Sequence, residues 1–348
     1  MASRKKYLQL YDAVMERIRS GSFSPGDKLP TEQAMMEEYG FSRQTVRQAL
    51  GKMEADGFIT RLQGSGSFVS AQARTICRTH RIAVITTYIS TYIFPSILRG
   101  IEDAATSHGY SILLKATNNS IAKERDILSG ISAQDVDGII VEGTKTVLPN
   151  PNLSFYHMLA STGLPLVFFN GYYPDLMAKG LHNVRYVVMD DRQGGYDLTH
   201  ELLLAGHRRI GAIFKSDDIQ GMRRFSGYVD ALAENDIPIQ DEDILWFNTE
   251  TKHTVAGQPG FSALLQNCTA LMCYNDEIAA QILAALQGAR ISSVRALRSF
   301  DGTLPARQPG PELYSCPHAK ERLGALTAEK LLRMIDGADE QNTVIPWG

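Results

Sequence analysis

The sequence of 348 residues contains only four cysteines and no long apolar run. Cys77, Cys268, Cys273 and Cys316 form no C-x-x-C pair, and no histidines stand at zinc-finger spacing from them. No apolar run reaches the ~18 residues that a membrane helix needs, and no signal core follows the basic N-terminus. These absences exclude a disulfide scaffold, a zinc finger and a membrane protein. They favour a cytoplasmic protein with reduced thiols and no metal or cofactor.

The composition is that of a globular protein, because 44% of the residues are hydrophobic. At about 100–200 residues per domain, the length predicts two or three domains. The net charge of −3 is unevenly distributed: residues 1–80 carry 12 Lys and Arg against 8 Asp and Glu, whereas the remainder is acidic. A basic N-terminal head on an acidic body indicates a polyanionic partner for the head.

The head begins with two predicted helices. Apolar residues three to four apart, from Tyr7 to Ile18, mark one face of the first helix. The second helix opens at Thr31, which can cap it, and at Glu32, whose charge suits the positive end of the helix dipole. Gly40 stands where a left-handed residue commonly ends a helix.

The third predicted helix has the pattern of a DNA-recognition helix. Ser42 can cap it, with Phe41 and Val46 as the hydrophobic pair that flanks such a cap. Its apolar face holds Val46, Ala49, Leu50 and Met53, and its other face holds Arg43, Gln44, Arg47 and Gln48. Arginine and glutamine can read guanine and adenine edges in the major groove. The alternative is an ordinary solvated helix face.

A glycine-tipped hairpin follows this helix. Residues 58–62 and 67–69 are predicted strands around a turn at residues 63–66. The sequence Gly64-Ser65-Gly66 is no phosphate loop, because neither a helix nor a suitably placed lysine follows it. A hairpin after two such helices is a wing, so the head is predicted to be a winged helix-turn-helix.

Residues 23–69, FSPGDKLPTEQAMMEEYGFSRQTVRQALGKMEADGFITRLQGSGSFV, resemble the winged helix-turn-helix of the GntR family of bacterial regulators. The matching pieces are PGDKLPTE, SRQTVRQAL and the G-x-G-x-F-V ending. The resemblance implies that the head binds double-stranded operator DNA. It places the following residues at the DNA: Thr31, Glu32, Ser42, Arg43, Gln44, Thr45, Arg47 and Gly66.

The body alternates short apolar runs with amphipathic stretches, which predicts doubly wound parallel α/β sheets. The predicted strands are residues 82–86, 112–115, 138–141, 166–169, 184–189, 210–214, 270–273 and 297–300. Two such units, joined around residues 170–184, would enclose a cleft. We therefore expect a winged head at 1–70, a linker at 71–80 and a two-lobed domain at 81–348 that resembles periplasmic binding proteins.

Polar and aromatic side chains follow these strands, where ligands of open α/β sheets bind. Arginine forks, amides, carboxylates and aromatic rings together suit a small, uncharged sugar. Turn and cap roles explain any one of these residues equally well. Paired carboxylates also leave open a glycoside-processing enzyme, and His200 and His207 lack the spacing of zinc ligands.

Four segments of the body resemble the effector domain of the LacI/GalR repressors. They are VVMDDRQGGYDLTHELLLAGHRRIGAIF, GMRRFSGY, ALMCYNDEIA and SFDG. The resemblance implies sugar contacts by Asp191, Arg224, Asn275 and Asp301.

A GntR-type head on a LacI-type body resembles the arabinose repressors of Gram-positive bacteria, as do ITTYISTYIFPSILRGIE and DGIIVEGTK. This resemblance implies a homodimeric repressor, not an enzyme, that releases its operator on binding L-arabinose. It adds the following pocket residues: Tyr92, Phe94, Glu142, Lys145, Lys215 and His318. The segments at 291–295 and 299–302 and the short C-terminus depart from the family pattern. An activator, another pentose or hexose effector, and a sugar-binding module without DNA remain alternatives.

Overall fold

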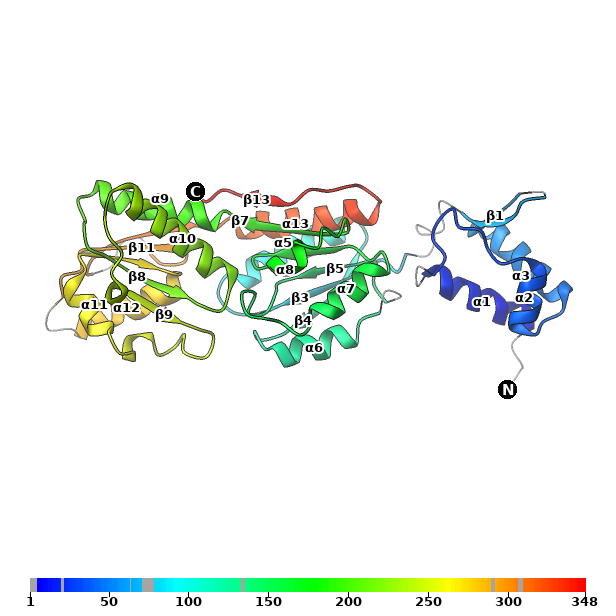
Figure 1. Ribbon diagram of the computed structural model, residues 1–348, viewed down its shortest axis with the longest axis horizontal. Coiled ribbons are helices and arrows are strands. Elements are labelled where there is room, and N and C mark those ends of the chain that lie inside the picture. Colours follow the sequence, from blue (N-terminus) through cyan, green and yellow to red (C-terminus); the bar gives the residue numbers. More distant parts are fainter. Residues whose placement is uncertain are drawn as a thin grey trace.

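The computed structural model describes residues 5–19, 22–62, 64–70, 78–132, 135–288, 292–305 and 309–348. A small head lies at one end of an elongated, two-lobed body (Figure 1). Residues 71–77 of the expected linker, with Cys77, lie outside the described residues, as do Gln63 of the expected wing turn and Ile291. Arg78, Thr79 and His80 precede the first strand of the body, and Asp137 accepts hydrogen bonds from the backbone amides of Thr79 and His80.

The head is a winged helix-turn-helix, as predicted. Its elements are α1 (Lys6–Arg19), α2 (Glu32–Tyr39), α3 (Arg43–Ala55), β1 (Ile59–Leu62) and β2 (Gly66–Val69). The Thr31 hydroxyl caps α2 by accepting from the Ala34 amide at 3.2 Å, and Gly40 ends it at φ 66°. The Ser42 hydroxyl caps α3 by accepting from the Thr45 amide at 3.3 Å. Both predicted caps are therefore confirmed.

The predicted apolar face of α3 is buried. Val46, Ala49, Leu50 and Met53 are all at most 1% exposed and pack in a core with α1. Strands β1 and β2 pair antiparallel and form the wing. The same packing leaves the other face of α3 at the surface.

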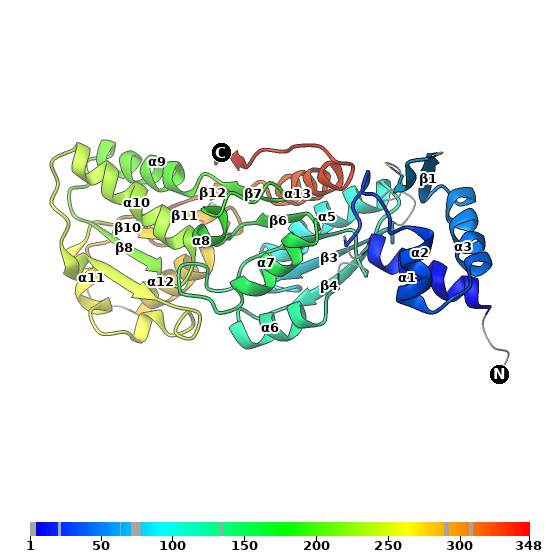
Figure 2. The ribbon, with the colours of Figure 1, turned by 45° about the vertical axis from the view of Figure 1, so that its right-hand side comes forward.

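Lobe one has a six-stranded parallel sheet in the order β13-β7-β6-β5-β3-β4. Its strands are β3 (Arg81–Thr86), β4 (Ser111–Ala116), β5 (Gly138–Val141), β6 (Leu166–Phe169), β7 (Val184–Met189) and β13 (Thr343–Ile345). Its helices are α5 (Phe94–Ser107), α6 (Ile121–Ser129), α7 (Leu153–Ser161), α8 (Pro174–Met177) and α13 (Lys320–Ile335). Helices α5 and α13 cover one face of the sheet and α6 and α7 the other (Figure 2).

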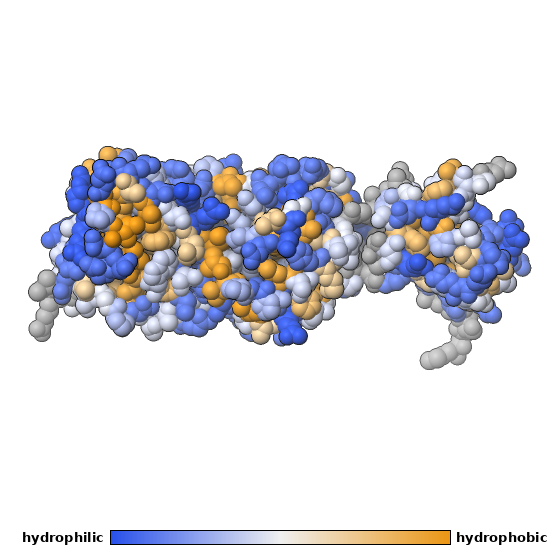
Figure 3. Space-filling model, in the orientation of Figure 1, coloured by the Kyte–Doolittle hydropathy of each residue, from blue (hydrophilic) through white to orange (hydrophobic). Residues whose placement is uncertain are grey.

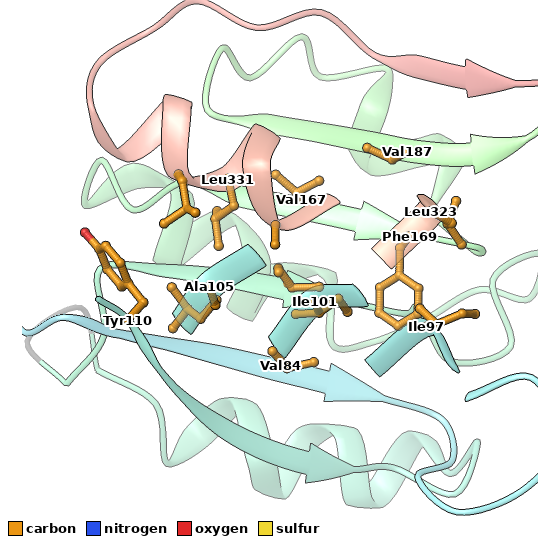
Figure 4. Close-up of a cluster of buried hydrophobic side chains, with 14 of the residues drawn as sticks. Val84, Ile97, Ile101, Ala105, Tyr110, Val167, Phe169, Val187, Leu323 and Leu331 are labelled. Atoms are coloured by element: carbon orange, nitrogen blue, oxygen red, sulfur yellow. The ribbon is translucent and has the colours of Figure 1, made fainter. Parts of the chain in front are cut away.

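The core of lobe one shows why its inner strands are apolar runs. Val84, Val167 and Phe169 point from the sheet toward Ile101 of α5 and Leu331 of α13 (Figure 4). The alternate residues of the same strands pack under α6 and α7 on the opposite face. Strands buried on both faces need apolar side chains at every position.

Lobe two has a five-stranded parallel sheet in the order β12-β11-β10-β8-β9. Its strands are β8 (Ile210–Lys215), β9 (Ile244–Phe247), β10 (Ala270–Cys273), β11 (Ala296–Asp301) and β12 (Glu312–Pro317). Its helices are α9 (Asp191–Leu204), α10 (Ile219–Glu234), α11 (Phe261–Asn267) and α12 (Asp276–Gly288), with short 3₁₀ turns η1 (Asp241–Asp243) and η2 (Val255–Gly257). The predicted class, a winged head on a two-lobed parallel α/β body, is confirmed.

The predicted junction between the lobes is wrong. Strand β7 belongs to lobe one, where it pairs with β6 and β13, so the chain enters lobe two only at Asp191. After β12 the chain returns through α13 to lobe one. The segment 170–184, which contains α8, is the crossover between two neighbouring parallel strands. Parallel strands need a connection of about a dozen residues or more. A stretch of this length without a strand is therefore compatible with a crossover as well as with a link between lobes.

Two glycines bring α9 and α10 into close contact. A Cβ atom on Gly195 would lie 2.2 Å from the carbonyl oxygen of Arg224, and one on Gly227 would lie 1.9 Å from that of Arg192. Larger residues would force the helices apart. This approach sets Asp191, at the start of α9, beside Arg224 on α10.

The described residues contain neither a membrane-spanning helix nor a metal-binding cluster. None of their helices is both long and apolar enough to cross a bilayer. No group of three or more His, Cys, Asp or Glu side chains in these ranges is placed to hold a metal ion. Cys268, Cys273 and Cys316 are buried free thiols.

Candidate functional site

A cleft between the two lobes gathers the polar side chains that follow the strands. It has a volume of about 950 Å³, including space open to solvent. Seven of the predicted ligand residues line it: Tyr92, Phe94, Glu142, Lys215, Arg224, Asn275 and Asp301. Tyr92, Phe94 and Glu142 come from lobe one and the other four from lobe two, so a molecule in the cleft would contact both lobes.

Arg224 is the fixed centre of the lobe-two wall. Its side chain is 2% exposed, and its Nε donates to Asp191 Oδ1 at 2.8 Å. A second donor, Nη1, binds the carbonyl oxygen of Tyr274. The guanidinium carbon lies 4.1 Å from the ring centroid of Phe300 and 5.1 Å from that of Trp347. Stacking against rings suits a planar guanidinium, so Arg224 presents its remaining donors in a set direction.

Burial raises the pKa of Asp191 to about 6, although Arg224 opposes this effect. Burial would lower the pKa of Arg224, but the neighbouring carboxylates Asp191 and Asp301 outweigh it and raise that pKa. The arginine therefore carries its charge at neutral pH.

Asp301 and Tyr92 meet across the cleft. The Tyr92 hydroxyl donates to Asp301 Oδ2 and accepts from the Asp276 amide at 3.1 Å. Burial raises the pKa of Tyr92, and the Asp301 charge adds to this, so the phenol keeps its proton. The other carboxylate oxygen of Asp301 is buried with no hydrogen-bond partner among the described residues. It is thus a free acceptor in the wall of the cleft.

Glu142 is a buried carboxylate without a cation in salt-bridge range among the described residues. It accepts from the Thr87 amide at 2.9 Å, from the Thr87 hydroxyl, and from Asn170 Nδ2 at 3.1 Å. Burial raises the pKa of Glu142, while the Thr87 hydrogen bonds oppose that rise. The Oδ1 atom of Asn170 is also buried and has no hydrogen-bond partner among the residues that the structure describes.

Lys215 is neutralised within lobe two. Its Nζ lies 2.9 Å from Asp218 Oδ2 and 3.1 Å from Asp217 Oδ1. Burial would lower the pKa of Lys215, but these two carboxylates raise it instead. Asp218 also caps α10 and accepts from the Tyr274 hydroxyl at 2.7 Å. The lysine therefore brings no uncompensated charge to the cleft.

Three other predicted ligand residues do not line the cleft. Lys145 pairs with Glu250 of lobe two at 2.5 Å, and Asp191 lies behind Arg224. His318 packs edge-on against Trp347, and both of its ring nitrogens are buried without a partner among the described residues. Burial lowers the pKa of His318 to about 3.

Several residues beyond the ten predicted ligand residues also line the cleft. Among them are Tyr88, Asn119, Asn170, Lys252 and Tyr274. Tyr88 and Asn170 belong to the polar and aromatic residues that the strand-end rule predicts at this edge, whereas Asn119 lies four residues beyond the predicted strand 112–115 and was not named. Lys252 follows β9, which was not predicted, and its Nζ lies 4.8 Å from the ring centroid of Tyr88.

The backbone of the cleft is strained at several points. Five residues that line or border the cleft have positive φ angles: Tyr92, Asn119, Lys145, Asn170 and Asp301, at 47–96°. Side chains other than glycine rarely adopt this conformation, at a cost of order 1–3 kcal/mol each. Such strain is typical of binding sites whose side chains are held in place by the surrounding fold.

The head carries a second candidate site on α3 and the wing. Arg43, Gln44 and Arg47 are exposed at the start of α3, and Thr45 is half-buried there. Glu32 of α2 accepts from the Nε atoms of both Arg43 and Arg47 at 3.3 Å. Gly66 opens the second wing strand at φ 114°, close to Lys28.

Comparison with known proteins matches both parts of the chain to known families. The sequence model of the bacterial regulatory proteins of the gntR family matches residues 6–69. The model of the periplasmic binding proteins and the sugar-binding domain of the LacI family matches residues 79–346. Among solved structures, the regulator CcpA of Lactococcus lactis covers 77% of this chain and 96% of its own, with a TM-score of 0.64 and 23% identity. A complex of the regulator CelR with cellobiose covers 98% of this chain and 97% of its own, with a TM-score of 0.64 and 19% identity.

Curated relatives match nearly the full length. The arabinose metabolism transcriptional repressor of Geobacillus stearothermophilus is 37% identical over 95% of this chain and 91% of its own. The protein of the same name from Halalkalibacterium halodurans is 33% identical over 98% of this chain and 93% of its own. The chain, with its gntR-family match over residues 6–69 and its LacI-family match over residues 79–346, therefore belongs to the family of these transcriptional repressors.

Proposed function

We propose that this protein is a cytoplasmic, homodimeric repressor that binds operator DNA and releases it on binding L-arabinose. The observation that carries the proposal is the 37% identity to an arabinose metabolism repressor over 95% of the chain. We assign residues 1–70 to DNA binding, 71–80 to a linker, and 81–348 to effector binding and dimerisation. The protein is proposed to have no catalytic role and no cofactor.

For DNA recognition we propose the exposed start of α3, the preceding helix and the wing. Arg43, Gln44 and Arg47 can pair with base edges, since the apolar face of α3 is buried on the opposite side. Thr31, Glu32, Ser42, Thr45 and Gly66 complete the proposed surface. A homodimer would set two such heads against the half-sites of a near-palindromic operator.

The pairing of two cleft cations with carboxylates supports an uncharged sugar over an anion as the effector. Lys215 is balanced by two aspartates, and Arg224 by Asp191. Free acceptors at Asp301 and Asn170 suit the hydroxyl groups of a sugar. Phe94 and Tyr88 add aromatic rings, on which the C–H face of a sugar can stack.

Contacts between the lobes suggest how sugar binding in the cleft changes the affinity of the head for operator DNA. Tyr92 binds Asp301, Asn119 donates to Thr249 at 2.5 Å, and Lys145 pairs with Glu250. A sugar held by both walls would add to these contacts and favour the closed arrangement of the lobes. A coupling of ~1–3 kcal/mol between cleft and operator would change operator affinity about 5- to 150-fold.

The sugar assignment can be tested by calorimetric titration of L-arabinose, D-xylose, D-ribose and D-galactose. We expect L-arabinose to bind tightest and Asp301→Asn to weaken binding at least about tenfold, since a sugar hydroxyl would lose a charged acceptor. The matched control is Asp236→Asn, an exposed aspartate of the same lobe, which should leave binding unchanged. Tighter binding of another sugar would replace arabinose, and equal effects of both variants would overturn the proposed pocket.

A further inference from the structure

A hydrogen bond between the lobes caps the helix that carries Arg224. Helix α10 begins at Ile219, and the preceding residue, Asp218, caps it by accepting from the Gly221 amide at 2.7 Å. The amide of Ile219 instead donates to the hydroxyl oxygen of Thr146, in lobe one, at 2.8 Å. The first amides of a helix have no partner within the helix itself. One of these amides of α10 is therefore satisfied by the opposite lobe.

Both members of this hydrogen bond are buried between the lobes. Thr146 is 3% exposed and Ile219 is 9% exposed, and the Ile219 side chain packs in a core cluster of lobe one. Figure 3 shows the surface of the body continuing across the boundary between the lobes on the face where α10 lies. Arg224 lies in the next turn of α10, so the position of Ile219 sets where the arginine stands relative to lobe one.

Thr146 stands in a loop, residues 143–146, that follows β5 and is tied to the core of lobe one. The hydroxyl oxygen of Tyr173 accepts from the Thr144 amide at 2.7 Å and lies 3.1 Å from the Thr144 carbonyl oxygen. The methyl group of Thr146 packs against Gly143, where an added Cβ atom would lie 2.5 Å from it. The Thr146 hydroxyl is therefore set in place by the backbone of its own loop.

The hydroxyl of Tyr173 is held in turn by a buried carboxylate. Glu124 is fully buried, and it accepts hydrogen bonds from Tyr173 at 2.5 Å and from Tyr156 at 2.8 Å. Two asparagines, Asn150 and Asn152, donate to its other oxygen at 2.8 Å. Burying a carboxylate is costly unless it is well hydrogen-bonded, so these four donors form one network with fixed geometry. The network fixes Tyr173 and, through it, the loop.

We propose that Thr146 is a positioning residue that couples sugar binding to closure of the lobes, and that Tyr173 sets its loop. Thr146 does so by supplying a helix cap that only the closed arrangement can form. The inference rests on the proposed sugar-controlled repressor. When the lobes separate, the Ile219 amide loses its protein partner, whereas a sugar that holds Arg224 against lobe one restores the contact.

Two variants of Thr146 separate its hydroxyl from its methyl group. Thr146→Val replaces the hydroxyl and keeps the methyl, whereas Thr146→Ser keeps the hydroxyl and removes the methyl. The full-length proteins are titrated in calorimetry with whichever of L-arabinose, D-xylose, D-ribose and D-galactose binds the wild-type protein tightest. Thr146→Val should weaken sugar binding at least about fivefold, the lower end of what an unsatisfied buried donor costs. Thr146→Ser should bind nearly as tightly as the wild-type protein.

Release of operator DNA should follow the same order. Thr146→Val should need more sugar to release its operator than the wild-type protein, in proportion to its weaker sugar binding. Operator affinity in the absence of sugar should not fall in either variant, because Thr146 lies in the body and the head is unchanged. Fluorescence anisotropy of labelled operator DNA measures both quantities.

Amide hydrogen exchange of the full-length protein, resolved to single residues, tests the contact itself. In Thr146→Val the Ile219 amide should exchange faster than in the wild-type protein, because it has lost its acceptor. The Gly221 amide is the internal control, since Asp218 of the same lobe caps it. Its exchange should not change. Added sugar should slow exchange at Ile219 in the wild-type protein and in Thr146→Ser, but not in Thr146→Val.

A matched pair of tyrosines tests the network behind the loop. Tyr173 and Tyr156 are both buried and both donate to Glu124, but only Tyr173 contacts the loop at Thr144. Tyr173→Phe and Tyr156→Phe should both make lobe one easier to unfold in denaturant. Only Tyr173→Phe should also weaken sugar binding and speed exchange at Ile219.

The outcomes separate the inference from the function on which it rests. If none of the four sugars binds the wild-type protein, the proposed effector fails, and the positioning role fails with it. If a sugar binds the wild-type protein and both Thr146 variants equally well, only the positioning role is overturned. Weaker sugar binding by Thr146→Val with unchanged exchange at Ile219 would instead make Thr146 a direct sugar contact. Equal effects of Tyr156→Phe and Tyr173→Phe on sugar binding would overturn the role of Tyr173.

Discussion

The head and the body both depend on arginines, but they hold them in opposite ways. In the head, Arg43 and Arg47 are mostly exposed and share one sheltered carboxylate, Glu32. In the body, Arg224 is 2% exposed, pairs with its own aspartate, Asp191, and lies against aromatic rings. The first arrangement leaves charge available to a polyanion, whereas the second uses charge only to orient hydrogen bonds.

This difference shows how one side chain type can serve two classes of ligand. An exposed arginine attracts phosphates at a distance, and salt screens that attraction. A buried, neutralised arginine exerts little long-range attraction and recognises a ligand only after it has entered the cleft. The proposed operator and effector sites therefore differ most in how strongly each should respond to charge and salt.

The largest expected effect comes from breaking the buried pair. Arg224→Met leaves Asp191 buried without its cation, which should lower the free energy of unfolding of the body by about 3–5 kcal/mol. Both tryptophans, Trp246 and Trp347, lie in the body, so their fluorescence reports its unfolding in denaturant. The double variant Arg224→Met, Asp191→Asn should recover much of the loss. A single variant as stable as the wild-type protein would contradict this account of the pair.

The corresponding change in the head should affect binding instead of stability. Arg47→Ala removes one exposed fork, so operator affinity should fall by about 1–3 kcal/mol. Unfolding and sugar affinity should not change, because the Arg47 side chain is 63% exposed. Arg99→Ala, which removes the same charge from the surface of lobe one, is the control in a fluorescence anisotropy titration of operator DNA. Equal losses in both variants would indicate an effect of net charge alone.

A pH titration tests the buried histidine that follows β12 in the body. His318 is buried and neutral, with its pKa lowered to about 3 from an ordinary value of 6.5, because burial disfavours the charged ring. Its contribution to stability is therefore complete above pH 6.5 and declines as the pH falls toward 3. By pH 5 the loss should reach about 2 kcal/mol. Unfolding of His318→Asn should lack this decline; parallel curves for the two proteins would show that His318 does not titrate in this way.

The smallest expected effect concerns Lys145, whose partner Glu250 is 61% exposed. Exposed ion pairs contribute about 0.2–1 kcal/mol, so Lys145→Met should weaken sugar binding less than about fivefold in calorimetry. Glu250→Gln should have an effect of similar size, and the two effects should not add. A hundredfold loss for Lys145→Met alone would support its predicted role as a sugar ligand.

The head could be predicted from the sequence almost residue by residue, because its signals are local. The caps at Thr31 and Ser42 and the apolar face of α3 each depend on residues a few positions apart. The contact of Glu32 with Arg61 could not be predicted. It joins residues 29 apart and depends on how the wing folds against α2.

In the body, the inner strands were predicted from the sequence, whereas three of the four edge strands were not. Inner strands such as β5 and β6 are buried on both faces and were predicted with their observed bounds. The strands β9, β12 and β13 were missed, and all three lie at sheet edges. Strand β12 carries exposed and polar residues and so lacks a continuous apolar run. Strand β13 has only three residues, and β9 is a run of four apolar residues, Ile244–Phe247, whose pattern does not by itself distinguish strand from helix.

The cleft shows the limit of reading a site from strand ends. Of the ten ligand residues predicted from strand ends and family resemblance, seven line the cleft. Neither could show that Asp191 lies behind Arg224, because that depends on the close approach of α9 and α10 at Gly195. Lys252 escaped notice because it follows the missed strand β9.

The most direct test of the central claim follows the anisotropy of labelled operator DNA, bound to the full-length protein at fixed salt, as sugars are added. L-arabinose, D-xylose, D-galactose and D-ribose are titrated separately into the complex. The account predicts release by L-arabinose at concentrations at which the other sugars leave the complex intact. An operator complex that none of these sugars disturbs would contradict a repressor controlled through this cleft by a pentose.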